Sequence, residues 1–382
     1  MTPTTKILLF GDICPTNDTL SLFESGNAEN LFNDVLVDLK QADFVLGNLE
    51  FVITDSPKSI QKAGPVLSAK TKCINVLKQA NFKLFSLANN HIKDCGEEGV
   101  ASTIDSCKKA GIDTTGADAD LSKAKQPYIT KVNGLKIGII AFAEQEFNTA
   151  TTHEYGANFF DPYEDLDLIE TTKASVDYLI VIYHGGVEYY AYPSPLLKKK
   201  CRKFIDKGAD LVTCQHSHCV GTIDDYKDKK IVYGQGNSVF GFREKDPSWN
   251  QGLVIELEWN SGDVKPLIKF IPIHANKAGI QRMEKNAGNK LLKEVAEKSM
   301  KINDDAFLEQ EWLMFCKQKK GLYFPFYFGY NRVLIHLNRL TKNGLIRLFY
   351  PKSKLRTSHN IIRCEAHNEV IQTLLKKESN KC

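Results

Sequence analysis

The sequence lacks any run of roughly 18 or more consecutive apolar residues, so no segment is predicted to cross a membrane as a helix. The first residues also lack the basic stretch and the following apolar stretch of a secretory signal, and they lead directly into a strand pattern. From these absences we expect a cytoplasmic protein, at most peripheral to the inner face of a membrane.

Cysteine is present, but the features of a disulfide framework are missing. The ten cysteines have no regular spacing, and none forms a Cys-x-x-Cys pair. Several of them, including Cys73, Cys107, Cys214 and Cys316, fall within apolar strand or helix patterns. This usage is typical of reduced thiols. The sequence also has no internal repeat and no low-complexity segment.

Acidic residues are missing from one long stretch of the chain. None occurs between Glu311 and Glu365, where eleven Lys and Arg residues stand among many aromatic residues. Elsewhere the composition is ordinary for a soluble globular protein, because the 382 residues are 42% hydrophobic and 25% charged, with a net charge of +4. The length allows one large domain with an appendage, or two domains.

The first two-thirds of the chain alternates between predicted strands and predicted helices. An Asn133-Gly134 turn between two strand patterns predicts one hairpin. The alternation favours α/β layers with a mixed sheet or a pair of stacked sheets. The strands are expected at 6–11, 43–47, 84–88, 128–132, 135–142, 177–183, 211–214, 253–259 and 266–273, and the helices at 29–40, 72–80, 97–109, 163–174 and 194–207.

After about residue 280 the pattern becomes helical. Apolar stripes predict helices at 291–302, at 307–315 behind a capping Asp304, at 331–342 and at 358–376. We therefore expect two parts, a catalytic-type α/β domain over 1–279 and a basic, aromatic-rich helical extension over 280–382.

Five predicted strands end in residues that can bind a metal ion. At one of these strand ends, His216 and His218 follow a short buried strand. In an extended chain, side chains two residues apart point to the same side, so both imidazoles are expected to face one point. Two converging imidazoles suit a metal, although two loop histidines hydrogen-bonded to water would look the same. Five such strand ends together favour a metal site. The others carry Asp12, Asn48 with Glu50, Asn90 with His91 and Asp94, and His184.

Six blocks of residues carry a resemblance to a known family. They are Gly11-Asp12, Gly47-Asn-Leu-Glu50, Ala88-Asn-Asn-His91-x-x-Asp94-x-Gly96, His184-Gly-Gly-x-Glu188-Tyr189, Gly208-Ala-Asp-Leu-Val-x5-His218 and Ile231-Val-Tyr-x3-Asn237. In these blocks, spread over about residues 5–273, the chain resembles the CapA (poly-γ-glutamate and capsule synthesis) family of the calcineurin-like metallophosphatase superfamily. The resemblance implies a four-layer αββα sandwich with a two-metal site, to which the helical C-terminal appendage is added.

The resemblance also implies a role for each matched residue. Asp12 and His218 would hold the first metal, and Asn90, His184 and His216 the second. Glu50 would stand at the bridging position, where one carboxylate can hold two cations about 3.5–4 Å apart. Mixed nitrogen and oxygen ligands suit two divalent ions of manganese, iron or zinc.

Three further residues are expected to act in catalysis. His91 matches the histidine that serves as general acid or orients a substrate oxygen, and imidazole titrates near neutral pH. Asp94 and Glu188 would orient histidines, although surface carboxylates or loop caps would fit as well. The superfamily usually has His where this chain has Cys14, so the first metal is expected to be weakly held; Cys14 is either a thiolate ligand or a plain buried thiol.

Two classes of function follow from the resemblance. The first is a metal-dependent hydrolase of phosphoesterase type that cleaves a phosphoester or an amide in the biosynthesis or modification of a bacterial capsule or surface polymer. The second is a non-catalytic polymer-binding or assembly factor with a vestigial metal site. His91 favours the enzyme, and Cys14 favours the alternative.

The basic, aromatic stretch 312–363, called the basic span below, allows three interpretations. It is a solvated helical cap, a peripheral contact with an anionic membrane close to lipid-linked precursors, or a binding site for an anionic polymer. Nucleic acid is not expected as a partner, because no recognisable binding motif accompanies the charge.

Overall fold

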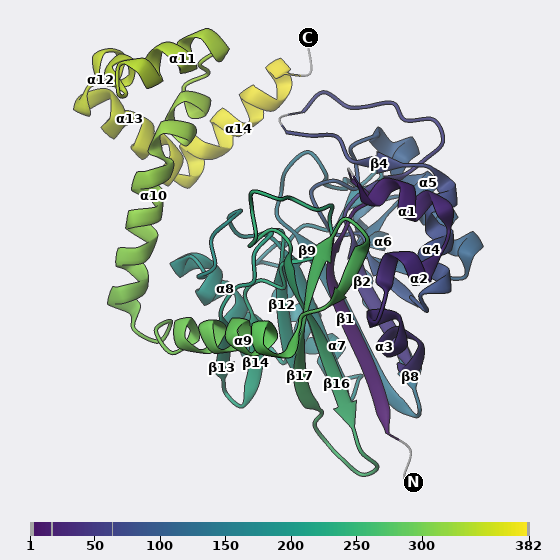
Figure 1. The fold of residues 1–382 in the computed structure, drawn as a ribbon. Coiled ribbons are helices and arrows are strands. Elements are labelled where there is room, and N and C mark those ends of the chain that lie inside the picture. Colours follow the sequence, from purple (N-terminus) through teal and green to yellow (C-terminus); the bar gives the residue numbers. More distant parts are fainter. Residues whose placement is uncertain (1–3, 17, 63, 380–382) are drawn as a thin grey trace. The chain divides into compact units, whose positions relative to one another are not determined.

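Two β-sheets form the centre of the α/β part of the protein in this computed structural model, which describes residues 4–16, 18–62 and 64–379 (Figure 1). The first sheet has the order β18 (Gly279–Arg282), β17 (Leu267–Asn276), β16 (Gln251–Trp259), β1 (Thr5–Ile13), β2 (Phe44–Leu49), β5 (Leu84–Ser86) and β6 (Asp113–Thr115), and β15 (Asn237–Val239) pairs with β1. The second has the order β13 (Ile223–Tyr226), β14 (Lys229–Val232), β12 (Leu211–Gln215), β11 (Tyr178–His184), β9 (Leu135–Ala143) and β8 (Tyr128–Val132). Two small two-stranded sheets pair β3 (Val52–Ile53) with β4 (Ser68–Ala69) and β7 (Ala117–Asp118) with β10 (Gly156–Ala157).

Strand β11 shows why its sequence is a continuous apolar run. Ile180 and Ile182 belong to the core that the second sheet shares with the first, whereas Leu179 and Val181 belong to a separate core that contains Phe204. Alternate side chains of a strand point to opposite faces, so this sheet is buried on both sides.

Helices cover the outer faces of the two sheets. The core of the first sheet takes in residues of α1 (Thr19–Ser25), α2 (Ala28–Phe32), α3 (Val35–Gln41), α4 (Ile74–Gln79) and α5 (Gly96–Ala110), and the outer core of the second sheet takes in residues of α7 (Asp165–Lys173) and α8 (Pro195–Asp206). A short helix α6 (Leu121–Ala124) precedes β8. The order of layers is therefore helix, sheet, sheet, helix, which confirms the predicted four-layer αββα class (Figure 1).

Parallel strands bring their carboxyl ends to one edge of each sheet. In the first sheet β1 is parallel to β2, and β2 to β5; in the second, β9, β11, β12 and β14 are parallel. The register places Asp12 opposite Asn48 in the first sheet and His184 opposite Gln215 in the second. The predicted hairpin is confirmed, because β8 and β9 pair across Asn133 and Gly134, which have φ of 49° and 90°.

The single helix predicted at 29–40 is wrong. Asn33 interrupts it with φ of 43° and ψ of −126°, and so the segment forms α2 and α3. The side-chain amide of Asn33 donates to the carbonyl oxygens of Ala278 and Ile280, at 2.9 and 3.0 Å. A tertiary contact with β18 therefore overrides the apolar helical stripe.

The helices of the C-terminal part also differ from prediction. The helix expected at 307–315 runs as α10 (Asp305–Tyr327), and the backbone amide of Phe307 donates to the side chain of Asp304 as the predicted cap requires. The helix expected at 358–376 is two helices, α13 (Lys352–Arg363) and α14 (Glu365–Ser379), because Cys364 is extended, with ψ of 115°. α11 (Arg332–Leu340) and α12 (Gly344–Phe349) precede them.

The chain divides into two compact units, 1–309 and 310–382. Helix α9 (Lys285–Ser299) and the start of α10 lie in the first unit, although the expected extension began at 280. Leu291 and Val295 of α9 pack with Leu253 of β16, and the buried Lys198 donates to the carbonyl of Ile302 at 2.6 Å. Among the described residues, no helix has both the length and the apolar character that crossing a membrane requires.

Candidate metal centre

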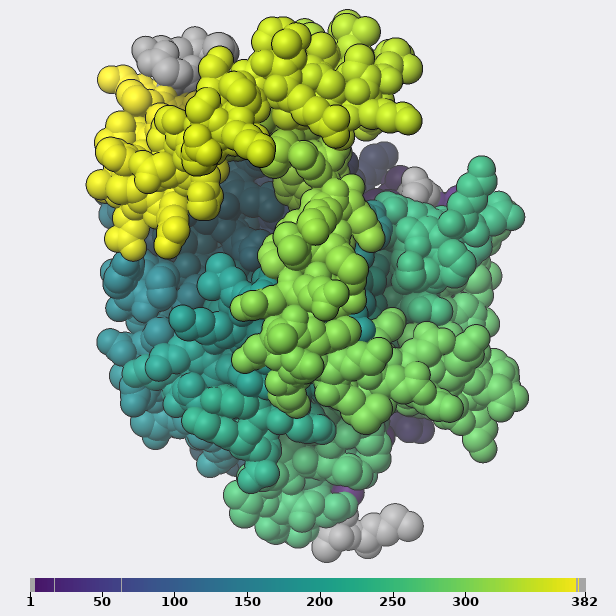
Figure 2. Space-filling model, turned by 90° about the vertical axis from the view of Figure 1, so that its left-hand side faces the viewer, coloured from purple at the N-terminus to yellow at the C-terminus, as the bar shows by residue number. Residues whose placement is uncertain are grey.

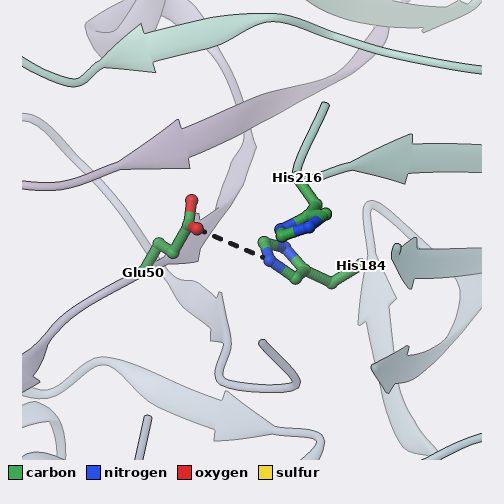
Figure 3. A group of neighbouring side chains, drawn as sticks. All are labelled: Glu50, His184 and His216. Atoms are coloured by element: carbon green, nitrogen blue, oxygen red, sulfur yellow. Dashed lines mark ion pairs between the residues drawn. The ribbon is translucent and has the colours of Figure 1, made fainter. Parts of the chain in front are cut away.

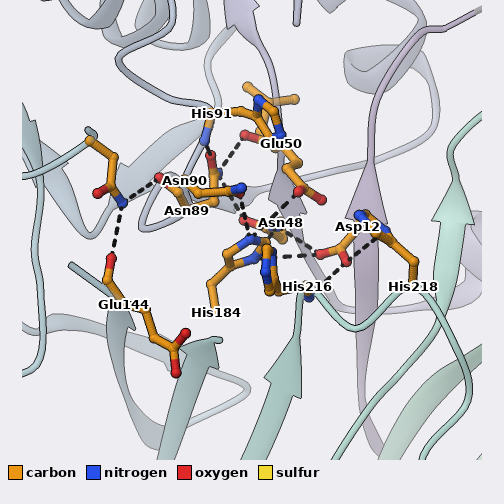
Figure 4. Close-up of polar contacts among 12 residues, drawn as sticks. Asp12, Asn48, Glu50, Asn89, Asn90, His91, Glu144, His184, His216 and His218 are labelled. Carbon is orange, nitrogen blue, oxygen red and sulfur yellow. Dashed lines mark hydrogen bonds and ion pairs between the residues drawn. The ribbon is translucent and has the colours of Figure 1, made fainter. Parts of the chain in front are cut away.

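The six predicted ligands come from the carboxyl ends of strands in both sheets, where their side chains converge (Figure 4). The first sheet contributes Asp12 near the end of β1, Glu50 just after β2, and Asn90 in the loop between β5 and α5. The second contributes His184 as the last residue of β11, and His216 and His218 directly after β12. Both sheets are therefore needed to assemble the site.

Two groups of ligand-type residues meet at Glu50. One contains Glu50, His184 and His216 (Figure 3), and the other Asp12, Glu50 and His218; in each, the ligand atoms lie within 4.8 Å of one another. The Nε2 atom of His184 lies 3.5 Å from Glu50 Oε1. The division of residues between the groups is the division that the resemblance implied, with Glu50 as the shared residue.

The backbone after β12 is not extended, so the expectation that His216 and His218 face one point because they are two apart in a strand is wrong. Both residues have positive φ, 86° and 52°, and their rings lie in different groups with centroids 6.1 Å apart. Two bonds hold this turn. The amide of His216 donates to Asp12 Oδ2 at 3.0 Å, and His218 Nδ1 lies 2.9 Å from Asn237 Oδ1.

A buried network of side-chain amides holds Asp12 and His184 in position. The side-chain amide of Asn48 donates to Asp12 Oδ1 at 2.8 Å and lies 3.1 Å from His184 Nδ1. Asn89 in turn donates to Asn48 Oδ1 at 3.1 Å. On the other side of the ring, His184 Nε2 lies 3.0 Å from the amide oxygen of Asn90. Because each bond limits ring rotation, the ligand atoms are held in place before any ion binds.

The two acidic residues of the site lack the positive charge that their burial requires. Asp12 and Glu50 are fully buried, and none of the described residues donates a hydrogen bond to either carboxylate oxygen of Glu50. Burial, reinforced by the neighbouring Glu50, raises the pKa of Asp12 to about 7, and burial raises that of Glu50 to about 8. Buried carboxylates without partners are costly, and a bound cation would compensate them. The donor set therefore fits a metal centre.

The three histidines are in the protonation state that a metal ligand needs. Burial lowers the pKa of His184 and His216 below the usual value, and burial lowers that of His218 to about 3. Neutral imidazole offers a lone pair to a metal. His218 is further enclosed by the rings of Phe240 and Trp249, with centroids 4.8 and 4.7 Å away.

Cys14 belongs to neither ligand group among the described residues. Its side chain is buried, and burial together with the charge of Glu50 raises the pKa of its thiol. In the protein without metal, Cys14 is therefore a neutral buried thiol, the second of the two interpretations that its position allowed.

The structure brings His91 and Asp94 together beside this site. His91 Nδ1 lies 2.7 Å from Asp94 Oδ2, as expected for a carboxylate that orients a histidine. Lys62 forms an ion pair with the other oxygen of Asp94, and both side chains are almost completely buried. No sequence pattern marks Lys62, since it lies in an irregular loop between β3 and β4.

Glu188 does not take the position expected of it. Its side chain is exposed, and it forms no hydrogen bond or ion pair with a histidine among the described residues. The turn that follows β11 carries the neighbouring Tyr189 with φ of 62°, and the amide of Tyr189 donates to the carbonyl of Ser217 at 2.8 Å. Glu188 is therefore a solvent-exposed carboxylate close to the site, where its charge contributes to the raised pKa of Glu50.

Comparison with known proteins identifies the family of this chain. The model of a family described as bacterial capsule synthesis protein PGA_cap matches residues 6–242. The capsule biosynthesis protein CapA of Bacillus anthracis is 31% identical over 252 residues, which are 64% of this chain and 60% of that protein. The PGA biosynthesis protein CapA of Bacillus subtilis (strain 168) is 30% identical over 246 residues, 63% of each chain.

A solved structure, the 5'-nucleotidase precursor from Thermus thermophilus, aligns with 79% of this chain and 60% of its own at 14% identity and a TM-score of 0.38. The chain spans about three-fifths of the length of the two CapA relatives. The family model covers well over half of the chain, through the strand ends that carry the ligand groups. The chain therefore belongs to the bacterial capsule synthesis family PGA_cap.

Proposed function

We propose that this protein is a metal-dependent hydrolase of phosphoesterase type that acts in the biosynthesis or modification of a bacterial capsule or surface polymer. The observation that carries the proposal is the position of Glu50. Its two buried oxygens have no hydrogen-bond donor in the part of the chain that the structure describes, and Glu50 is shared by both ligand groups. A carboxylate placed in this way suits two cations better than it suits a protein core.

The ligand groups divide the metal-binding roles. Asp12, Glu50 and His218 would hold one divalent ion, and Glu50, His184 and His216, with the amide oxygen of Asn90 close by, would hold a second. Nitrogen and oxygen donors of this kind suit manganese, iron or zinc. When bound, these ions would supply Lewis-acid stabilisation of the charge that develops on the scissile group.

His91 is the residue that we propose moves a proton. Asp94 engages its Nδ1 atom, which leaves Nε2 as the nitrogen that can donate to a leaving alkoxide or amine. The same donor would serve a phosphoester or an amide bond, so the geometry of His91 does not distinguish between them. A purely structural metal site would have no use for this pair.

The substrate is proposed from the relatives. Two of them are named for capsule and PGA biosynthesis, and a third, from Mycobacterium tuberculosis, is named a probable polyglutamine synthesis accessory protein. We infer an anionic surface polymer, or a lipid-linked precursor of one, as the substrate of this chain.

The first test is the metal content of protein purified without chelator, measured by elemental mass spectrometry. Wild type should carry close to two transition-metal ions, and Glu50→Gln should lose most of both because both groups depend on that carboxylate. The matched control is Glu256→Gln, a buried strand carboxylate paired with Lys6 outside the site, which should leave the metal content unchanged. Wild-type protein that stays free of metal after manganese or zinc is supplied would refute the metal centre.

The second test is activity of the loaded protein on a p-nitrophenyl phosphodiester and on a γ-glutamyl anilide. Hydrolysis of either, abolished in Glu50→Gln and retained in Glu256→Gln, would support the hydrolase and identify the bond class. The replacement of the usual histidine by Cys14 favours the alternative, a polymer-binding or assembly factor with a vestigial site. Protein that binds metal and poly-γ-glutamate but hydrolyses neither probe would support that alternative.

A further inference from the structure

Helix α11 exposes an apolar stripe. Val333, Leu337 and Leu340 follow the spacing of one helix face, and their side chains are 66%, 43% and 68% exposed. Leu348 and Phe349 at the end of α12 are 71% and 53% exposed. Single exposed apolar residues are ordinary, but six large ones within two short helices, with Leu334 as the sixth, are unusual for a surface that faces only water.

Positive charge surrounds these apolar residues. Arg332 and Arg339 are seven residues apart and share one side of α11, next to the apolar stripe. The basic span contains no acidic residue. From residue 332 to residue 356 the exposed Lys and Arg residues are Arg332, Arg339, Lys342, Arg347, Lys352, Lys354 and Arg356. Figure 2 shows part of this segment, in yellow-green, at the molecular surface.

Helices α11 and α12 form a hairpin with buried contacts of its own. The apolar residues described above are therefore exposed on a folded element. Asn338 is completely buried; its side-chain amide donates to Asn343 Oδ1 at 2.8 Å, and its Oδ1 accepts from the amide of Ile346 at 3.3 Å. Ile346 is itself buried. The rings of Phe328 and Tyr350 stack with centroids 3.5 Å apart and tie the end of α10 to the end of α12.

We propose that the α11–α12 hairpin docks on the surface of a bilayer that contains anionic phospholipid. Such a surface satisfies both features together, because lipid phosphates pair with Lys and Arg while the acyl boundary receives Leu and Phe. A soluble polyanion would neutralise the charge but leave the apolar stripe in water. At nine residues α11 is about 14 Å long, about half of the hydrocarbon thickness, so it lies in the interface rather than across it.

The docking inference does not depend on the metal centre. Its charge complementarity and its apolar stripe belong to residues 332–356, whereas the ligand groups belong to residues 12–218. A failure of hydrolysis and a failure of docking are therefore separate results.

The experiment is co-sedimentation of the full-length chain with vesicles of phosphatidylcholine, with or without phosphatidylglycerol. Binding is expected only with phosphatidylglycerol, and it should be lost at high salt because the screening length falls from about 10 Å at 0.1 M to about 3 Å at 1 M. The double variant Leu337→Gln/Leu340→Gln keeps the charge and should weaken binding by about tenfold or more, because it removes the groups that enter the acyl boundary.

The matched control replaces two exposed apolar residues of the other unit, Val37→Gln/Val264→Gln, and should bind vesicles as wild type does. Circular dichroism of each variant shows that the helices are retained. A further variant, Arg332→Gln/Arg339→Gln, removes two positive charges and keeps the exposed apolar residues. It should also weaken binding.

Three results would overturn the inference. Wild type could fail to sediment with anionic vesicles at low salt. The leucine and control variants could bind equally well, which would reduce the effect to charge alone. Sedimentation velocity could show a wild-type dimer that Leu337→Gln/Leu340→Gln dissociates, together with no vesicle binding, which would assign the stripe to a second copy of the chain.

Discussion

The Nδ1 atom of His91 lies 2.7 Å from the Oδ2 atom of Asp94, and the same carboxylate holds the loop that follows β3. Lys62 pairs with Asp94 Oδ1, and the amide of Leu67 donates to Oδ2 at 2.7 Å. The backbone carbonyl of Asp94 also accepts from the amide of Ile60 at 3.0 Å. The residue that orients the proposed proton donor therefore also anchors this loop through Ile60, Lys62 and Leu67.

We predict that Lys62→Met destabilises the protein by about 3 kcal/mol, because it leaves the buried carboxylate of Asp94 without its cationic partner. The control is Lys58→Met in the same loop, whose partner Glu98 is exposed, and exposed ion pairs contribute little. Urea unfolding measures both changes. Equal stability of the two variants would show that the buried Lys62–Asp94 ion pair contributes no more to the free energy of unfolding than the exposed Lys58–Glu98 pair.

Asp94→Asn and His91→Gln should each lower kcat by about a hundredfold or more while the metal content stays at the wild-type level. The two residues act as one unit, so the double variant should be no slower than His91→Gln alone. Steady-state kinetics on whichever probe is hydrolysed gives the comparison, and Asp105→Asn, on the exposed side of α5, is the control. Additive losses in the double variant would contradict a shared role.

The stability of the chelated protein should depend on pH in a defined direction. Above about pH 7 the three histidines are largely neutral in both states, because their pKa is about 6.5 in the unfolded chain and lower when folded. Asp12 and Glu50, with pKa values of about 7 and 8 when folded, ionise in the unfolded chain at much lower pH. The unfolded state then binds fewer protons, so the free energy of unfolding falls as pH rises from about 7 to about 8.

Thermal unfolding with chelator present measures this decline. Saturating manganese or zinc should abolish it, because a bound cation favours the ionised carboxylates. In Glu50→Gln the decline above pH 7 should be largely absent, because the pKa of the remaining Asp12 is about 7. A chelated wild type whose melting temperature is constant over this range would contradict the proposed charge state of the site.

Cys14→Ala should leave the metal content unchanged, since Cys14 lies in neither ligand group. Cys14→His should instead raise the occupancy of the site formed by Asp12, Glu50 and His218, because it adds an imidazole beside these ligands, at the position where the resemblance implied a histidine. Elemental analysis after dialysis against dilute zinc compares the two variants with wild type. Loss of metal in Cys14→Ala would show that the thiolate is a ligand after all.

The sequence by itself determined the layers and the strand ends of this protein. Buried strands such as 177–183 are marked by local apolar runs, and Asn133-Gly134 is marked by its own turn preference, so neither depends on distant residues. Ligand-type residues at several strand ends predicted one site, because parallel strands end at a common edge. His91 and Asp94 are expected to lie close together for a local reason, because they are three residues apart in one loop.

The tertiary structure alone decided the features that depend on contacts between distant segments. Asn33 breaks a helical stripe because its amide bonds carbonyls 245 and 247 residues away. Lys62 reaches Asp94 from a loop with no pattern of its own. His216 and His218 separate into two ligand groups because their backbone adopts positive φ against Asp12 and Asn237. Local preference cannot encode such choices, since their free energy comes from partners that only the folded chain brings near.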